Sequence, residues 1–305
     1  MDLKKNYYNK YLTRFAGVAA GLLILLLALF LSPAVPCSAG TASVTWRVTQ
    51  YGDDHAGKQS MFYTIKGSNG RLIVIDGGWT DQEAFVRKTI QGLGSKVDLW
   101  IITHPHPDHT GAFIKIFSSP GDIRIRKVIA PKINDSRYRK YKHSWDEYPV
   151  FQQFMKLMSG TSKIHWKGAD DSFRFSGLKF QFFNGYSSTL TNTTKDICNG
   201  SSLVFKVSGR KTSMLFTGDI LTKVGRRLIN TYKKQLKSTY LQAPHHGNNT
   251  GRYSFYKYIG ADITFVDAPA FLRTYPAVAR NLQNIKALGG QVYTYSSSRR
   301  SVIIH

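Results

Sequence analysis

The stretch Leu99–Ala112, LWIITHPHPDHTGA, decides the fold prediction for this chain. Four hydrophobic residues at its start predict a short buried strand, and the loop that follows holds His104, His106, Asp108 and His109. Imidazole and carboxylate groups at this density suit zinc, or else iron or manganese, and no thiolate lies in the stretch. Two prolines stiffen the loop, which lowers the entropy cost of ordering it around an ion. The alternative is a polar loop whose histidines cap the next helix; we favour a metal site.

Three further stretches place an acidic residue or a histidine directly after a hydrophobic strand. They are RLIVIDGG at 71–78 with Asp76, MLFTGDI at 214–220 with Asp219, and LQAPHHGN at 241–248 with His245 and His246. Together with the HxHxDH pattern, this order of motifs resembles the metallo-β-lactamase superfamily. Similar TGD and HHG motifs make the β-lactamase-like domain of ComEC-type competence proteins the closest resemblance, over residues 44–305.

The resemblance implies an α/β (α+β) fold, a four-layer αβ/βα sandwich of two mixed sheets packed face to face with helices outside. The alternation of predicted strands and helices agrees with that architecture. It also implies two divalent metal ions, zinc first and manganese or iron second. Asp76 is expected to orient the ligand loop by fixing an imidazole tautomer. The implied ligands are His104, His106 and Asp219 for one ion, and Asp108, His109, Asp219 and either His245 or His246 for the other.

This donor set supports hydrolysis. A bridging carboxylate holds two ions about 3.5–4 Å apart, and a water between them ionises near neutral pH and attacks a phosphorus or a carbonyl carbon. The metals take up the charge that develops, so no serine or cysteine nucleophile is needed. Asp108 is placed to hold the attacking water and accept its proton. The candidate catalytic residues are therefore Asp108, His109 and Asn199.

The segment Asn199–Ser202 departs from the usual superfamily pattern. ComEC-like domains have a similar Asn/Ser stretch where other members have a metal-binding histidine, so one ion is expected to have fewer protein ligands. Asn199 is expected to hydrogen-bond substrate or a metal-bound water instead. The chain has only two cysteines, Cys37 and Cys198, which argues against a disulfide scaffold. We expect Cys198 to be a small buried residue rather than a nucleophile.

Residues 1–43 predict a signal peptide or an N-terminal membrane anchor, and residues 44–305 a single hydrolase domain. Four bases and one acid in the first 14 residues precede Phe15–Leu31, which carries no charge. Small residues after Cys37 offer a cleavage site. Positive charge on the amino side predicts that this side stays in the cytoplasm. The domain is then extracytoplasmic, either secreted or anchored to the cell membrane by the N-terminal segment.

The net charge is +24, and +21 once the four bases and one acid of the leader are removed. An exported domain this basic concentrates on polyanions such as nucleic acid, anionic lipid or phosphate-bearing wall polymers. Bases alternate with aromatic residues at 132–148, a composition that suits a nucleic-acid strand. A second run of bases, Lys223–Lys237, follows Asp219. For both segments an ordinary solvated surface is the alternative.

We therefore expect an exported metal-dependent phosphodiesterase with nuclease-like activity on an anionic substrate. Two alternatives stay open. One is a hydrolase of a small carboxyl ester, lactam or phosphoester, for which the charge is incidental. The other is an inactive, wall-associated, polyanion-binding module with an incomplete metal site. Among the other histidines, His55, His143 and His165 are expected to be surface or structural residues rather than ligands.

Overall fold

The computed structural model describes residues 43–188, 196–248 and 251–305, and strands in that part of the chain form two seven-stranded sheets. In spatial order the first sheet contains β16 (Ser301–Ile304), β1 (Trp46–Tyr51), β2 (Phe62–Gly67), β3 (Leu72–Asp76), β5 (Leu99–Ile101), β7 (Val128–Ala130) and β8 (Ile164–Trp166). The second contains β15 (Gln291–Tyr293), β14 (Ile263–Phe265), β13 (Tyr240–Gln242), β12 (Ser213–Phe216), β11 (Val204–Ser208), β10 (Leu178–Asn184) and β9 (Ser172–Phe175). A two-stranded ribbon joins β4 (Lys96–Val97) to β6 (Arg124–Ile125).

The helices and short turns connect these strands. Before the second sheet they are η1 (Thr80–Gln82), α2 (Glu83–Gly92), α3 (Pro107–Ser118), α4 (Asp135–Tyr141) and α5 (Tyr148–Ser159). Within and after it they are α7 (Ile197–Gly200), α8 (Thr222–Tyr232), η2 (Lys233–Leu236), η3 (Pro244–Gly247), α9 (Tyr253–Ile259), α10 (Ala270–Arg273) and α11 (Pro276–Ala287).

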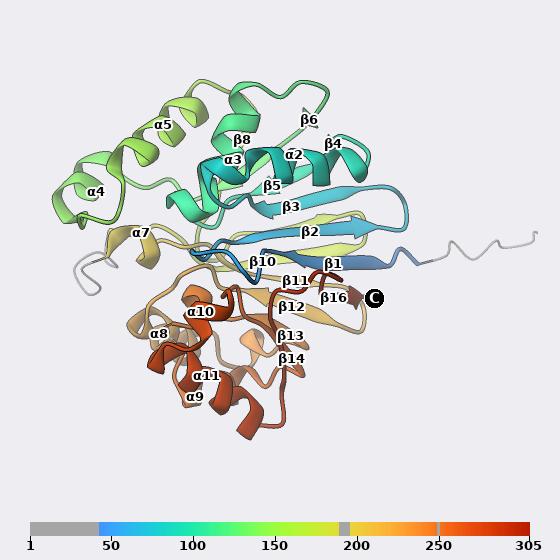
Figure 1. Ribbon diagram of the computed structural model, residues 1–305, viewed down its shortest axis with the longest axis vertical. Helices are drawn as coiled ribbons and strands as arrows, with labels where there is room; N and C mark the ends of the chain where they lie inside the picture. The colour runs from blue at the N-terminus through green and yellow to red at the C-terminus, as the bar shows by residue number, and fades with distance from the viewer. Residues whose placement is uncertain (1–42, 189–195, 249–250) are drawn as a thin grey trace, which may run out of the picture. The chain divides into compact units, whose positions relative to one another are not determined.

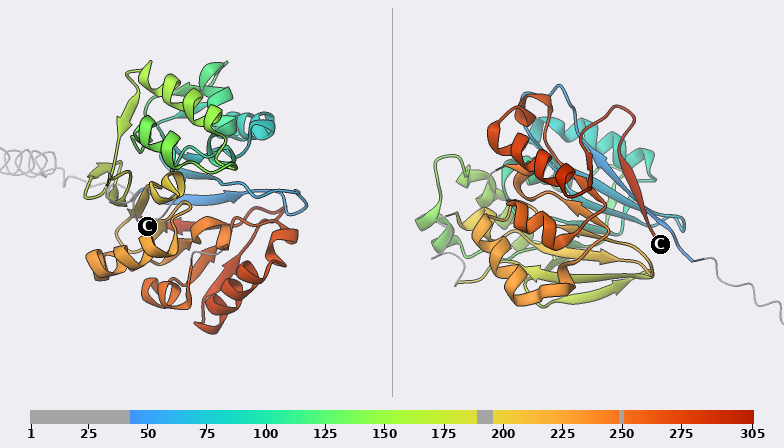
Figure 2. Two further views of the ribbon diagram at one scale, coloured as in Figure 1. Left: turned by 90° about the vertical axis from the view of Figure 1, so that its left-hand side faces the viewer. Right: turned by 90° about the horizontal axis from the view of Figure 1, so that it is seen from below.

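The sheets face each other and the helices cover their outer faces. Alternating residues such as Trp46 and Val48 on β1, and Phe180 and Phe205 on the second sheet, form one core between the sheets. The other face of the first sheet packs against α2, α3 and α5, and that of the second sheet packs against α8, α9 and α11. The two groups of helices lie above and below the strands in Figure 1, and Figure 2 shows the same layers from two further sides. The predicted sandwich is confirmed.

Three local predictions need correction. The alternation of Val44, Trp46 and Val48 predicts a strand at an exposed edge, but C-terminal β16 pairs with β1 and places Ile304 opposite Trp46. Apolar and basic residues alternate over 123–130 and predict one strand, but it is interrupted at Arg126 and Lys127, where the chain passes from the ribbon into the first sheet. Thr110 and Gly111 after the histidine loop predict the start of a helix, but the helix already begins at Pro107, a residue that suits the first turn of a helix.

The predicted leader lies outside the described residues, apart from Ser43, and so does most of the polar loop at 187–194. Residues 44–305 form one compact unit. In the described residues no helix is long and apolar enough to cross a membrane.

Parallel strand pairs bring the sequence motifs to one end of the sandwich. Strand β3 pairs in parallel with β5, so Asp76 and the loop after Ile101 leave the same edge of the first sheet. Strand β12 pairs in parallel with β13, so Asp219 and the two histidines of η3 leave the same edge of the second sheet. Gly218 lies where the two sheets pack closely, and an added Cβ there would meet Ser202 and Thr103 side-chain atoms at 3.0 Å.

Candidate metal centre

Four of the predicted ligands come together in a buried group. One donor atom from each of Asp108, His109, Asp219 and His246 lies within 4.8 Å of the others. The His246 Nε2 atom is 3.2 Å from Asp108 Oδ2 and 3.2 Å from Asp219 Oδ2. The His109 Nε2 atom is 3.4 Å from Asp219 Oδ1. Two carboxylates and two imidazoles around one point form a donor set that suits zinc, manganese or iron.

Buried polar atoms of this group test whether it fits an ion. Within the described residues, His109 Nε2, Asp219 Oδ1 and His246 Nε2 are buried and make no hydrogen bond. Burying such a polar atom costs free energy unless a hydrogen-bond partner or a cation satisfies it, and native proteins rarely leave such atoms unpaired. Because all three atoms belong to the four-residue group, a divalent cation would satisfy them together. The residues therefore fit a metal ion.

The Asp76 carboxylate holds the histidine loop in place. It accepts hydrogen bonds from the Thr103 backbone N–H (2.7 Å) and the Thr103 hydroxyl (2.7 Å), and its Oδ2 is 2.7 Å from His109 Nδ1. The contact to His109 Nδ1 turns Nε2 toward the group. Since the Thr103 hydroxyl donates to Asp76, it accepts from His104 Nδ1 at 3.1 Å, which leaves the lone pair of His104 Nε2 for another partner. Asp76 has a φ of 53°, a backbone conformation that Asp and Asn tolerate.

His104 and His106 form a second group with a residue that the sequence analysis did not choose as a ligand. The His104 Nε2 atom is 3.1 Å from His106 Nδ1, and both rings are buried. The thiol of Cys198 completes a group in which one donor atom of each residue lies within 4.8 Å of the others. Asp219, predicted to bridge both ions, is grouped only with Asp108, His109 and His246.

The His106 ring is oriented by a carboxylate that the sequence analysis missed. Its Nε2 atom is 2.9 Å from Asp146 Oδ1, and Asp146 is fully buried. The other Asp146 oxygen accepts from the His143 backbone N–H at 2.6 Å. Asp146 lies in the segment 132–148, which has no clear periodicity and holds three acidic residues, so no sequence signal distinguished Asp146 from the other two.

The two adjacent histidines of η3 separate in space. His245, His246 and Gly247 all have positive φ, and this left-handed turn directs the two rings differently. The His246 ring is buried and its Nδ1 lies 3.0 Å from the Asp267 carbonyl, whereas the His245 side chain is 28% exposed and its Nε2 is 3.9 Å from Asp219. The geometry therefore favours His246 over His245.

Asn199 is held by α7 rather than directed freely at the two groups. Its backbone N–H and side-chain Nδ2 donate to the two Asp196 oxygens at 2.9 and 2.8 Å. Its Oδ1 atom is buried and makes no hydrogen bond within the described residues. Among the side-chain atoms of Asn199, Oδ1 is therefore the one without a hydrogen-bond partner in the described part of the chain.

Within the four-residue group, ionic attraction outweighs the effect of burial on the pKa values. Burial favours neutral Asp219, but His246 and His109 outweigh this and hold the pKa of Asp219 well below its usual range. Burial also disfavours a charged His246, yet Asp219 and Asp108 raise its pKa to about 10. An ion that binds here must displace these protons, so its affinity rises with pH.

Three other histidines lie away from these groups. His55 follows a turn stabilised by Asp53, and His143 stacks on Trp145 with ring centroids 4.3 Å apart. His165 of β8 is exposed and lines a cavity of about 660 Å³. None of the three belongs to a group of potential ligands in the described part of the chain.

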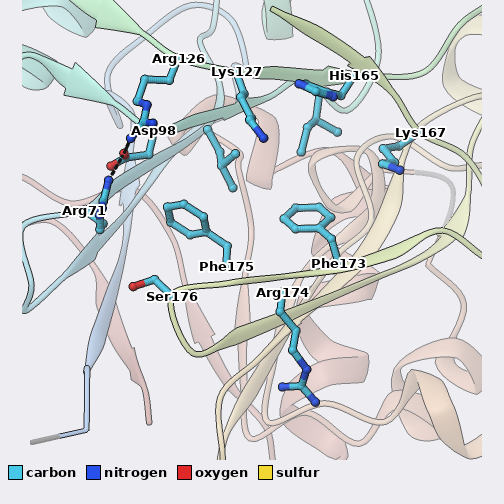
Figure 3. A pocket seen from close by; sticks show the side chains of 12 residues that line it. Arg71, Asp98, Arg126, Lys127, His165, Lys167, Phe173, Arg174, Phe175 and Ser176 are labelled. Carbon is cyan, nitrogen blue, oxygen red and sulfur yellow. Dashed lines mark hydrogen bonds and ion pairs between the residues drawn. The ribbon is translucent and has the colours of Figure 1, made fainter. Parts of the chain in front are cut away.

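That cavity lies between the sheets at the opposite end of β5 from the histidine loop. Leu99, Ile129, Phe173 and Phe175 supply its apolar lining, and bases surround it. Figure 3 shows Lys127 pointing toward the two phenylalanine rings, while Arg174 points away from them. The only acid in its lining, Asp98, is paired with Arg71 at 2.8 Å and Arg126 at 3.4 Å. The lining is therefore basic and aromatic.

Solved structures with the same fold share little sequence with this chain. The protein YhfI of Bacillus subtilis, described as a metallo-beta-lactamase fold protein, is 12% identical with a TM-score of 0.52, over 85% of this chain and 99% of that one. Zn²⁺-bound PqqB of Methylobacterium extorquens is 10% identical with a TM-score of 0.50, over 85% and 99%. CmlA of Streptomyces venezuelae, a diiron beta-hydroxylase, is 13% identical with a TM-score of 0.51, over 84% and 54%.

Sequence comparisons give the family. The uncharacterized protein YcaI of Escherichia coli K12 is 30% identical over 89 residues, which are 29% of this chain and only 12% of that relative. The family model described as the metallo-beta-lactamase superfamily matches residues 56–252, which include all the histidine and aspartate motifs. The chain belongs to the metallo-β-lactamase superfamily.

Proposed function

We propose that this chain is a metal-dependent hydrolase that cleaves phosphodiester bonds in an anionic polymer such as nucleic acid. The observation that carries the proposal is the buried group of Asp108, His109, Asp219 and His246, in which three polar atoms have no hydrogen bond within the described residues. A zinc-bound protein and a diiron protein share the fold, so the fold can hold metal at protein ligands. We propose two ions, zinc by preference.

In this mechanism the chain positions the ions and the reacting groups. Divalent ions bound here supply positive charge against the phosphate and a lowered pKa for water. The Asp76 carboxylate and the Thr103 hydroxyl keep His109 and His104 in the orientation that directs Nε2 inward. Asp108 accepts from Gln59 Nε2 at 3.3 Å through Oδ2, and its other oxygen is proposed to take the proton of the attacking water.

The proposed substrate class rests on charge. The chain carries 42 bases against 18 acids, and Asp108 and Asp219 would repel a phosphate unless cations covered them. On α4, Arg137 and Lys140 lie over the Tyr141 ring at 5.7 and 5.4 Å, a pairing of cations and aromatics that suits single-stranded nucleic acid. The TGD and HHG motifs lead us to propose ComEC-type domains as close relatives.

We also propose that the domain acts outside the cytoplasm. The support is the basic, then apolar, N-terminal sequence, which is typical of a signal peptide or a membrane anchor. A reporter fused after His305 that is active only in the cytoplasm would contradict this location.

One experiment tests the function. The purified full chain is stripped of metal with a chelator, reloaded with zinc or manganese, and incubated with DNA, RNA, a small phosphodiester and a neutral carboxyl ester. We expect metal-dependent cleavage of nucleic acid that weakens as salt rises. Equal activity on the neutral ester without salt dependence would favour a small-substrate hydrolase. Salt-sensitive binding of DNA without turnover under either metal would indicate a binding module.

A further inference from the structure

His104 and His106 form a candidate metal position that requires a third donor. His104 Nδ1 donates to Thr103 and His106 Nε2 faces Asp146, so with both rings neutral the lone pairs of His104 Nε2 and His106 Nδ1 point at each other across 3.1 Å. Two such lone pairs repel unless a proton or a cation lies between them. Nitrogen ligands of one tetrahedral zinc are about 3.3 Å apart, so this spacing suits a shared ion.

The neighbouring carboxylates make other contacts. Asp146 accepts from the His143 backbone and faces His106 Nε2. Both Asp196 oxygens accept from Asn199, which fixes the start of α7. Asp219 faces His109 and His246. The remaining donor grouped with His104 and His106 is the sulfur of Cys198.

Helix α7 holds that sulfur in place. Cys198 is fully buried and packs with Tyr138, Phe151 and Ile197 in a small hydrophobic cluster. Its sulfur lies within 4.8 Å of a donor nitrogen of His106 and of His104. A buried cysteine that serves only packing would face apolar groups, whereas this thiol meets an imidazole.

We propose that His104, His106 and Cys198 bind one divalent ion of the zinc class, with the thiolate in the place where other superfamily members use a third histidine. The inference rests on the proposed metal dependence. The thiol proton is released to solvent when the ion binds, because only the thiolate is a ligand. A second ion is held by Asp108, His109, Asp219 and His246.

The two positions then differ in metal preference. A thiolate with two imidazoles selects zinc or cobalt and discriminates against magnesium and manganese, which prefer oxygen. The group with two carboxylates accepts manganese as well as zinc. Manganese alone is therefore expected to fill one position per chain, and zinc or cobalt two.

Cobalt(II) reports a sulfur ligand directly, because a cobalt–thiolate bond gives an intense near-ultraviolet charge-transfer band that nitrogen and oxygen ligands do not give. The metal-free full chain is titrated with cobalt, and the spectrum and the bound metal are measured. We expect the band in the wild type and in Cys37→Ser, the matched control that removes the only other cysteine. We expect its loss in Cys198→Ser and Cys198→His.

Substitutions of Cys198 also show whether this residue is a metal ligand or only a packing residue. Cys198→Ala is expected to lower zinc affinity at one position by more than about 100-fold, since even residues that only orient a ligand contribute about 10–100-fold. Cys198→His is expected to keep two bound ions without the band. Two bound cobalt ions in the wild type without the band would overturn this inference and leave the proposed hydrolase standing. If the chain bound no cobalt, both this inference and the proposed metal-dependent hydrolase would be overturned.

Discussion

The two ends of strand β5 carry opposite chemistry. After Ile101 the chain enters buried histidines and carboxylates, each fixed by a named partner, whereas Leu99 at the other end borders an open cavity lined by bases and phenylalanines. Buried polar groups must be satisfied, so the structure determines their geometry; exposed bases are already satisfied by water. We infer that the first end governs turnover and the second contributes only to affinity for anions.

The largest effect is expected at the histidine end. Asp219→Ala leaves His109 and His246 without their shared carboxylate, and should lower phosphodiester turnover on the order of 10³-fold while polymer affinity changes little. Turnover and fluorescence-anisotropy binding measure the two quantities. Lys127→Ala serves as the control at the other end of β5, and a larger loss of turnover there would contradict the comparison.

The second-largest effect is expected from Asp76, which orients the His109 ring. Asp76→Asn keeps the positive φ and the hydrogen bond from the Thr103 N–H, but presents an amide to His109 Nδ1 and so disfavours the productive tautomer. We expect a loss of about 10–100-fold in metal affinity or activity. Asp98→Asn, the matched change beside the cavity, should leave both unchanged. If calorimetric zinc titrations gave equal effects for Asp76→Asn and Asp98→Asn, the inferred difference between the two ends of β5 would be wrong.

The stability of the metal-free protein should depend on pH through the histidine end. The pKa of His246 is raised from 6.5 to about 10 in the folded chain, so its contribution to stability is fully present below pH 6.5 and is lost as the pH rises toward 10. Melting temperatures of the chelated protein should therefore fall between pH 7 and 10. Zinc-loaded protein should not show this fall, and identical profiles would contradict the assignment.

The smallest effect is expected at the cavity. Lys127→Ala should weaken DNA binding only a few-fold and lower the slope of log affinity against log salt by about 1 if Lys127 meets a phosphate. Lys88→Ala, an exposed lysine on α2, is the control of equal charge. Lys140→Ala on α4 tests the predicted basic–aromatic segment in the same way. A small phosphodiester should be cleaved at the wild-type rate by all three variants.

Much of the architecture was predictable because strand periodicity and turn residues are local signals. The family motifs all follow strands as expected. The strands at the sheet edges were not predictable. Strands β1 and β16 pair although about 250 residues separate them, and the residue pattern of β1 does not indicate which strand pairs with it.

The sequence alone was enough to predict the candidate ligands His104, His106, Asp108, His109 and Asp219, because each of them follows a hydrophobic strand. Which of several nearby residues reach the candidate metal centre depended on the tertiary structure. It buried His246 rather than His245, through a left-handed turn, and it brought Cys198 and Asp146 to the two histidines from more than 35 residues away. The physical reason is that side-chain identity is local information, whereas the distance between two donor atoms depends on how separate strands and helices pack.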